Sequence, residues 1–541
     1  MENKNSKFII WLPLLLSIAV ALGFSVGSVM TSGNGSQNDV EKGISKFREI
    51  LSHVNGSYVD PVESDALVES AIVSMLENLD PHTAYLPAKD HEYSKSELEG
   101  NFDGIGIEFG IFRDTIYVVA PLSGGPSEAV GLVSGDKIVK VDGENVAGIG
   151  ITTRGVFDQL RGPKGSKVEV AIKRRNESNL LDFTIIRDKI PQFSLDASYM
   201  VDREIGYIKI NRFSATTYKE FKAALEKLID NGMTKLVLDL TGNPGGYMDR
   251  AIKMADELLP SDPMIVFTKG KEPRYNQQHR AGRQGIFEKG GLIVLIDGGS
   301  ASASEIVAGA VQDNDRGLIV GRRSFGKGLV QLPIELNDKS ELRLTISRYY
   351  TPSGRSIQKS YANGQEDYRQ DGFSKRYHNG EMFSADSIEL NDSLVFKTTK
   401  GRTVYGGGGI VPDVFVALDT VNSSVYLNRL FNTGTIREYA LDYTEVNKDE
   451  LEAQGYDSYF SSFEVSDDMI RDLAKLGEQN NLPVNEKQLN HSRDLIKIYV
   501  KAQIARGIWK NDGFYPIFNQ TNEIFLKALE MFDEAEQLAS R

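Results

Sequence analysis

The chain has 541 residues, more than one domain needs, and its content of 40% hydrophobic and 25% charged residues is that of an ordinary globular protein. Its net charge of −13, from 62 basic and 75 acidic residues, argues against nucleic acid as a partner. The absence of cysteine excludes disulfides, zinc–thiolate sites and cysteine catalysis.

The N-terminus predicts a membrane anchor. Lys4 and Lys7 precede an uncharged apolar run over residues 8–30, and about 20 such residues suffice to span a bilayer. A cleaved signal peptide is the alternative, but no clear Ala-x-Ala-like cleavage site is present. Because the lysines lie on the short side of the run, we expect residues 1–7 in the cytoplasm and the body of the chain on the extracytoplasmic, periplasmic side.

Residues 31–99 are expected to form a linker and a helical region. The polar stretch 32–38 is typical of a flexible tether, and apolar residues then recur at three- and four-residue intervals up to Leu79. The segment 80–83, Asp-Pro-His-Thr, ends this helical pattern. We interpret His82 within it as a structural turn residue rather than a catalytic one.

Residues 100–190 resemble a PDZ domain. Gly104, Ile105, Gly106 and Ile107 would form its carboxylate-binding loop and open into a strand. Successive backbone N–H groups at such a turn can hold the terminal carboxylate of a peptide, and the strand can pair with the peptide as a new edge. The alternative is a small β-domain that serves only as a brace.

Residues 191–419 alternate strand and helix patterns, which predicts an α/β core with mainly parallel strand pairing. In open α/β sheets, sites form beyond the carboxyl ends of the strands, where Gly245, Gly246 and Ser302 stand. We therefore expect these residues to share one cleft. The expected strands are 205–210, 235–240, 292–296, 318–320 and 342–350, and the expected helices are 217–229, 247–259 and 302–312.

Ser302 stands in the run Ser-Ala-Ser-Ala-Ser-Glu over residues 300–305, at a strand-to-helix turn. The backbone N–H groups and the helix dipole at such a turn suit a nucleophilic serine if a base can reach it. Lys327, between two glycines, is the available base. It must be neutral to act, so its pKa must fall well below the usual value of about 10.4. From the residues alone, an N-capped small-residue helix and a solvated loop lysine remain alternatives.

The segment 321–327 also fits the Gly-x-x-x-x-Gly-Lys pattern of a phosphate-binding loop. Gly328, however, takes the place of the Ser or Thr that would hold magnesium. Residues 329–336 moreover predict a strand where that loop would need a helix. We therefore exclude nucleotide binding.

The serine run, followed by Phe-Gly-Lys-Gly-Leu-Val-Gln over residues 325–331, resembles the carboxyl-terminal processing (tail-specific) serine peptidases with a PDZ domain. The resemblance spans roughly residues 80–414 of this chain. It implies that Ser302 is the nucleophile, Lys327 the general base and Gln331 the residue that orients the lysine.

A second element of the resemblance is the segment 238–246, Leu-Asp-Leu-Thr-Gly-Asn-Pro-Gly-Gly. The oxyanion hole should combine the backbone N–H of Ala303 with that of Gly245 or Gly246, because glycine lets the backbone approach the substrate carbonyl closely. Thr241 stands where the family usually carries arginine, which leaves the role of that arginine open. This chemistry requires no metal and no organic cofactor.

The resemblance also implies a crotonase-like spiral core. The expected fold class is therefore α/β, with an inserted PDZ-like β-rich domain and helical N- and C-terminal regions. Within the core, residues 359–396 turn polar and are interpreted as a surface excursion. Residues 420–541 show helical patterns without an active-site motif, and we expect them to serve packing, partner binding or assembly into a homo-oligomer.

The sequence thus predicts a serine endopeptidase with a Ser/Lys dyad. It would cleave protein or peptide substrates recognised near their free C-termini through the PDZ domain, and the anchor would make the membrane a further partner. A catalytically silent PDZ scaffold is disfavoured by the intact Ser302, Lys327 and Gln331. A crotonase-like acyl-CoA enzyme is disfavoured by the export signal, because coenzyme A is a cytoplasmic cofactor.

Overall fold

The computed structural model describes residues 35–540, except for 123, 176, 283 and 371, and divides the chain into two compact units that meet after Asn78. The expected cytoplasmic tail 1–7 and anchor 8–30 lie outside the described residues. Among the helices from residue 35 onward, none combines the length and the apolar character that crossing a bilayer requires.

The first unit contains two helices, α2 (Gly35–Ser57) and α3 (Ser64–Glu77). The helical pattern expected up to Leu79 is therefore present, but it is interrupted at residues 58–63, where Pro61 disfavours helical backbone at the preceding residue. Helix α2 also begins at Gly35, so the stretch 32–38 is not wholly the flexible tether that the sequence predicts.

The centre of the second unit is a six-stranded sheet in the order β10-β11-β12-β15-β16-β21. Strand β10 pairs with β11 in antiparallel fashion, and the remaining strands pair in parallel, as the alternating pattern predicts. The strands are β10 (Leu195–Met200), β11 (Ile205–Ile210), β12 (Lys235–Asp239), β15 (Gly291–Ile296), β16 (Leu318–Gly321) and β21 (Val414–Phe415).

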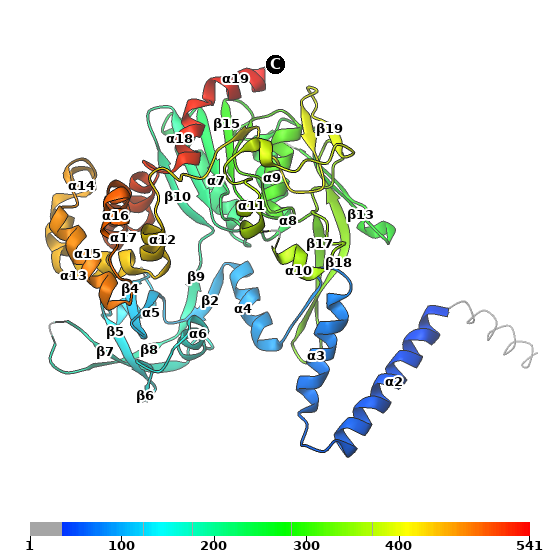
Figure 1. Cartoon of the computed structure of the whole chain (residues 1–541), viewed down its shortest axis with the longest axis horizontal. Coiled ribbons are helices and arrows are strands. Elements are labelled where there is room, and N and C mark those ends of the chain that lie inside the picture. The colour runs from blue at the N-terminus through cyan, green and yellow to red at the C-terminus, as the bar shows by residue number, and fades with distance from the viewer. Residues whose placement is uncertain (1–34, 123, 176, 283, 371, 541) are drawn as a thin grey trace, which may run out of the picture. The chain divides into compact units, whose positions relative to one another are not determined.

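Helices cover both faces of this sheet because its strands are apolar on both sides (Figure 1). Side chains alternate along each strand, so in β15 Leu292 and Val294 face one helical layer while Ile293 and Leu295 face the other. The first layer is α7 (Thr217–Asp230), α8 (Met248–Leu258) and α9 (Ala303–Asp313), and the second is α18 (Glu523–Glu530) and α19 (Phe532–Ser540).

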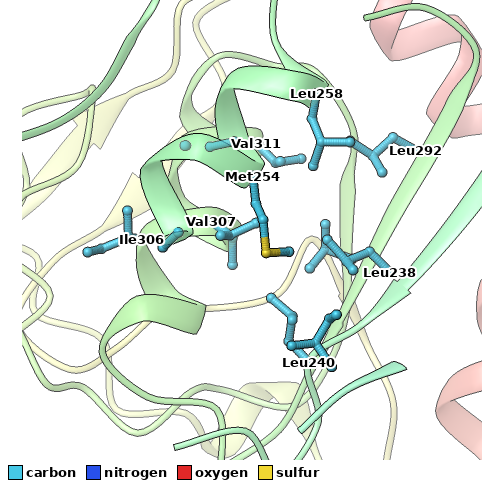
Figure 2. Packing of buried hydrophobic residues seen from close by; sticks show 14 of the residues in the cluster. Leu238, Leu240, Met254, Leu258, Leu292, Ile306, Val307 and Val311 are labelled. Carbon is cyan, nitrogen blue, oxygen red and sulfur yellow. The ribbon is translucent and has the colours of Figure 1, made fainter. Parts of the chain in front are cut away.

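The first layer packs α8 and α9 directly against the sheet. Figure 2 shows Met254 of α8 and Val307 of α9 meeting Leu238 of β12. All three side chains are fully buried, and burying one such side chain contributes about 1.5–3 kcal/mol. This packing fixes the start of α9, and with it Ser302, relative to the loop that follows β12.

A second, five-stranded sheet pairs entirely in antiparallel fashion. The strand expected at 342–350 exists as β18, but it pairs in this antiparallel sheet and not in the mainly parallel one. Its neighbour β17 precedes it across a short turn, and that connection permits antiparallel pairing only. The strands are β1 (Ala84–Leu86), β13 (Met264–Gly270), β14 (Gln278–Arg280), β17 (Leu329–Glu335) and β18 (Glu341–Tyr350), and the 3₁₀ turn η1 (Pro273–Tyr275) lies between β13 and β14.

A β-rich domain follows helix α4 (Ala88–Glu99) and is closed by the two-stranded ribbon β2 (Asn101–Gly104) and β9 (Asp188–Pro191). Its sheet has the order β3-β4-β5-β7-β8, so β3 has a free edge. The elements are β3 (Ile107–Phe112), β4 (Thr115–Pro121), α5 (Pro126–Ala129), β5 (Lys137–Val141), β6 (Glu144–Asn145), α6 (Thr153–Leu160), β7 (Lys167–Lys173) and β8 (Leu181–Ile186).

The polar excursion contains short helices and a small hairpin, and the chain then becomes helical to its end. Helices α12 to α17 form a separate apolar cluster, whereas α18 and α19 return to the central sheet. The excursion holds α10 (Gln365–Gln370), α11 (Phe373–His378), η2 (Ala385–Ser387), β19 (Val395–Lys397) and β20 (Thr403–Tyr405). The helices after it are α12 (Val425–Asn432), α13 (Thr435–Gln454), α14 (Tyr456–Ser462), α15 (Asp467–Gln479), α16 (Glu486–His491) and α17 (Arg493–Phe518).

Candidate active site

Ser302 occupies a strained turn between β15 and α9. Its backbone has φ 55° and ψ −110°, outside the region that residues with a Cβ ordinarily adopt. The other two serines of the run are fully buried and hydrogen-bonded: Ser300 Oγ donates to the Leu240 carbonyl at 2.8 Å, and Ser304 Oγ donates to the Asn243 carbonyl at 3.0 Å. Ser302 is partly exposed, so it is the serine of the run that a substrate can reach.

Asn243 joins this turn to the loop after β12. Its backbone carbonyl accepts the N–H of Ala301 at 3.0 Å, and its side-chain Nδ2 donates to the Ile210 carbonyl at 2.9 Å. Its Oδ1 accepts the N–H of Gly245 at 2.9 Å. The sequence reasoning missed this role, although a polar residue between a strand and a Pro-Gly-Gly turn is a recognisable signal for such side-chain capping.

The two glycines lie against the serine. A Cβ on Gly245 would stand 2.8 Å from Ser302 Cβ and 2.9 Å from the Ala303 nitrogen, and Gly245 has φ +98°. A Cβ on Gly246 would stand 2.1 Å from the Phe213 carbonyl oxygen. Neither position can therefore hold another residue without moving the backbone.

Of the three candidate oxyanion donors, two are unused. The N–H groups of Ala303 and Gly246 donate to no acceptor within residues 35–540 as described, whereas the Gly245 N–H is occupied by Asn243. The choice between the two glycines that the sequence leaves open thus favours Gly246. A hole built from such preorganised N–H groups needs no rearrangement to receive a developing negative charge.

Lys327 is held by Gln331. Its Nζ donates to Gln331 Oε1 at 2.8 Å, and Gln331 Nε2 in turn donates to the backbone carbonyl of His82. Because a carbonyl can only accept, this second bond turns Oε1 towards the lysine. Burial lowers the pKa of Lys327 below its usual value, and the positive charge of Arg343 lowers it further.

The dyad is not yet hydrogen-bonded. Among the described residues, no hydrogen bond joins Lys327 to Ser302, and the Nζ contact is with Gln331. Catalytic hydrogen bonds are often long before substrate binds and tighten in the complex. The described structure therefore orients the lysine through Gln331, without a direct bond to Ser302.

Glu305 links the segments that carry the two dyad residues. Its carboxylate accepts from the backbone N–H groups of Ser302 at 2.8 Å, Gly326 at 2.7 Å and Lys327 at 2.9 Å, and from Ser324 Oγ at 2.5 Å. Burial raises the pKa of this carboxyl to about 7. The sequence reasoning included Glu305 in the motif but assigned it no role, because its partners Ser324, Gly326 and Lys327 lie about twenty residues away.

Thr241 stands where the similar family usually carries arginine, and in this chain a lysine on the neighbouring strand contacts it. Lys209 of β11 donates to Asp239 Oδ1 at 2.9 Å and to Thr241 Oγ1 at 2.8 Å. Tyr207 donates to the other oxygen of Asp239 at 2.7 Å. This buried cluster fixes the end of β12, from which the glycine loop starts, and no local sequence pattern indicates it.

His82 contributes through its backbone, which agrees with its interpretation as a turn residue. Asp80 closes the turn by accepting the N–H groups of His82 at 2.8 Å and Thr83 at 2.9 Å. Burial lowers the pKa of His82 to about 4, with a further contribution from the charge of Lys327. The imidazole is thus neutral near pH 7 and lies next to the residue that orients the base.

The loop expected to bind a carboxylate connects β2 and β3. Within the described structure, the N–H groups of Ile105 and Gly106 donate to no acceptor, and the Ile105 carbonyl accepts from Ser127 Oγ at 2.7 Å. Gly106 has φ +75°, and a Cβ there would contact Ile190 at 3.0 Å. The loop opens into the free edge of β3 at Ile107, while Gly104 ends β2.

Comparison with known proteins connects these two regions to families. The model of peptidase family S41 matches residues 204–366, a PDZ domain model matches 117–174, and a family of unknown function matches 426–510. The carboxy-terminal-processing protease of Bartonella bacilliformis is 39% identical over 329 residues, which cover 60% of this chain and 74% of that relative.

Two further proteins are similar to this chain. The carboxy-terminal processing protease CtpA of Bacillus subtilis is 31% identical over 353 residues, which cover 65% of this chain and 74% of that relative. Among solved structures, the photosystem II D1 C-terminal processing protease is 26% identical, with a TM-score of 0.35, over 70% of this chain and 88% of that one.

Proposed function

The chain belongs to the carboxy-terminal processing proteases of peptidase family S41, which are serine peptidases with a PDZ domain, and from this premise we propose that it is an endopeptidase with a Ser302/Lys327 dyad. The observation that carries the proposal is the pair of buried contacts around the base. Gln331 orients Lys327, and burial together with the Arg343 charge lowers the lysine pKa, which favours the neutral amine that a base needs. Ser302 is strained and accessible, as a nucleophile must be.

In the first half of the reaction, neutral Lys327 takes the proton of Ser302 Oγ as that oxygen attacks the peptide carbonyl. The negative charge that develops on the carbonyl oxygen is received by the N–H groups of Ala303 and Gly246, and one such donor is worth about 3–4 kcal/mol. The C–N bond then breaks, and the protonated lysine gives its proton to the departing amine. An acyl-enzyme ester on Ser302 remains.

In the second half, the neutral lysine takes a proton from water, which attacks the ester. The same oxyanion donors serve again, and the proton returns to Ser302 Oγ as the C–O bond breaks. Gln331 supports the lysine without adding charge. A carboxylate in its place would raise the pKa of Lys327 and weaken it as a base.

Substrate recognition is assigned to the loop Gly104–Ile107. The unused N–H groups of Ile105 and Gly106 provide donors for a terminal carboxylate, and the free edge of β3 offers a backbone ladder for the preceding residues. The proposed substrates are therefore protein chains with an accessible, extended C-terminus.

The test compares matched fluorogenic peptides with a free-acid or an amidated apolar C-terminus. The proposal expects hydrolysis that is lost in Ser302→Ala and a higher kcat/KM for the free acid, because amidation removes the charge that the loop should hold. Equal kcat/KM for the two peptides would contradict tail recognition. Hydrolysis that survives in purified Ser302→Ala would contradict the serine mechanism.

The proposal also includes the cellular location of the chain. We propose that residues 8–30 anchor the chain in the membrane with its catalytic body on the periplasmic side, on the basis of the apolar run and the lysines before it. Protease accessibility of the intact cell before and after outer-membrane permeabilisation tests this placement. The crotonase-like spiral description of the peptidase core stays a prediction.

A further inference from the structure

The polar excursion reaches the active site through Tyr368 of α10. The Tyr368 side chain is only 4% exposed, and its hydroxyl lies 2.6 Å from His82 Nε2. The two rings meet edge to face with centroids 5.3 Å apart. The expectation that this segment is a mere surface excursion is therefore incomplete.

The hydrogen-bond directions around Tyr368 can be assigned from its neighbours. Gly328 N–H must donate, and it does so to Gln358 Oε1 at 2.8 Å, which turns Gln358 Nε2 towards the tyrosine oxygen at 3.3 Å. Tyr368 Oη thus accepts from that amide and also lies within hydrogen-bond distance of His82 Nε2. Tyr368 thereby ties the turn before β1 to the residue that directly follows Lys327.

Other contacts of α10 and α11 hold the same two segments. Gln365 Nε2 donates to the Asp80 carbonyl at 3.3 Å, on the turn that contains His82. Arg376 donates to the carbonyls of Arg323 at 2.8 Å and Ser324 at 3.0 Å, on the loop that leads to Lys327. The excursion thus contacts the turn that holds Gln331 and the loop that bears the base.

From this geometry we infer that Tyr368 is a positioning residue for the proposed Ser/Lys reaction. It fixes His82, whose carbonyl holds Gln331 Nε2, so that Gln331 Oε1 can hold Lys327 Nζ. Tyr368 does not touch the reacting atoms. Its loss should leave substrate binding intact and reduce the fraction of time in which the lysine is aligned with Ser302.

The test uses Tyr368→Phe in the full chain, with a free-acid fluorogenic peptide as substrate. Removing one neutral hydrogen bond should lower kcat about five- to tenfold with KM unchanged. The matched control is Tyr377→Phe on α11, which alters an exposed ring of the same excursion and should keep wild-type kcat. Thermal unfolding of both variants identifies any loss of fold.

A double-mutant cycle separates positioning from a general structural effect. If Tyr368 acts through Gln331, Tyr368→Phe in the Gln331→Ala background should change kcat by less than about twofold. A wild-type kcat in Tyr368→Phe, or losses that multiply in the double variant, would overturn the inference. Because it rests on the proposed function, a wild-type chain without peptidase activity would overturn both.

Discussion

The carboxylate of Glu305 accepts the backbone N–H of Lys327 at 2.9 Å. The same oxygen also accepts the N–H of Ser302, so a single buried atom joins the backbone of the proposed nucleophile to that of the proposed base. These residues are far apart in the chain, and the packing of α9 on β12 would not by itself fix their spacing. The relative position of the dyad therefore depends on this carboxylate.

Glu305→Gln should disrupt both dyad segments. Each carboxylate oxygen receives two donors, of which at least one is a backbone N–H, so either orientation of the amide places an NH₂ group against a group that can only donate. We expect a fall of about 1–3 kcal/mol in the free energy of unfolding, measured in urea, and at least about a tenfold fall in kcat. The exposed Glu335→Gln should change neither quantity, and an active, stable Glu305→Gln enzyme would show that the link is dispensable.

Substitutions of the dyad residues and of Gln331 should lower kcat by different amounts. Lys327→Ala and Ser302→Ala should each lower kcat by at least about 10²-fold with the thermal midpoint preserved, since they remove proton transfer and the nucleophile. Gln331→Ala should lose only about tenfold, because it orients the base and carries no proton. A Lys327→Ala enzyme with full activity at neutral pH would rule out lysine as the base.

The pH dependence of acylation follows from the lowered pKa of Lys327. The neutral amine is the active form, so the single-turnover acylation rate should rise with pH through the lysine pKa and level off below the usual lysine value. Arg343 contributes to this depression, and its removal in Arg343→Gln should raise the pKa and move the rising limb to higher pH. Arg348→Gln, exposed on the same strand, should leave the limb in place. A limb that shifts equally in both variants, or a flat profile, would contradict the assignment.

The sequence patterns predicted those helices and strands whose bounds depend mainly on neighbouring residues. Strand β11 and helix α7 follow the expected ranges within one residue, because apolar alternation and helical spacing mark both faces of each element. The pairing partner of β18 could not be read in this way. Its alternation fits either sheet, and only the short connection from β17 requires an antiparallel neighbour.

The candidate site likewise contains residues that could be recognised from the sequence and residues that could not. Ser302 and Lys327 stand in short motifs, so their segments were recognisable from sequence. Tyr368 and Lys209 act through partners 286 and 30 residues away, respectively, and neither has a local signature that distinguishes it from a surface tyrosine or a strand lysine. Such positions become visible only when tertiary packing places them beside the motif.

The last prediction concerns the attachment of the β-rich domain to the C-terminal helices. Leu441 of α13 is buried against Phe112, Tyr117 and Val119 of the domain's sheet. Beside this cluster, Glu108 of β3 accepts hydrogen bonds from Arg437 at 2.6 Å and lies 3.1 Å from Arg506. The helices thus hold the strand that is proposed to receive the substrate tail.

Leu441→Ala should loosen this attachment. A buried Leu→Ala change costs about 2–5 kcal/mol, and here the loss falls on the contact between the domain and the helices. We expect a lower thermal midpoint for the first unfolding transition and a several-fold higher KM for free-acid peptides. The kcat of a saturating peptide should change little, because the cluster contains no residue of the proposed dyad. Val446→Ala on the same helix, whose side chain is exposed, provides the matched control. An unchanged KM with a clearly lowered midpoint would show that the helices stabilise the domain without placing β3 for the substrate.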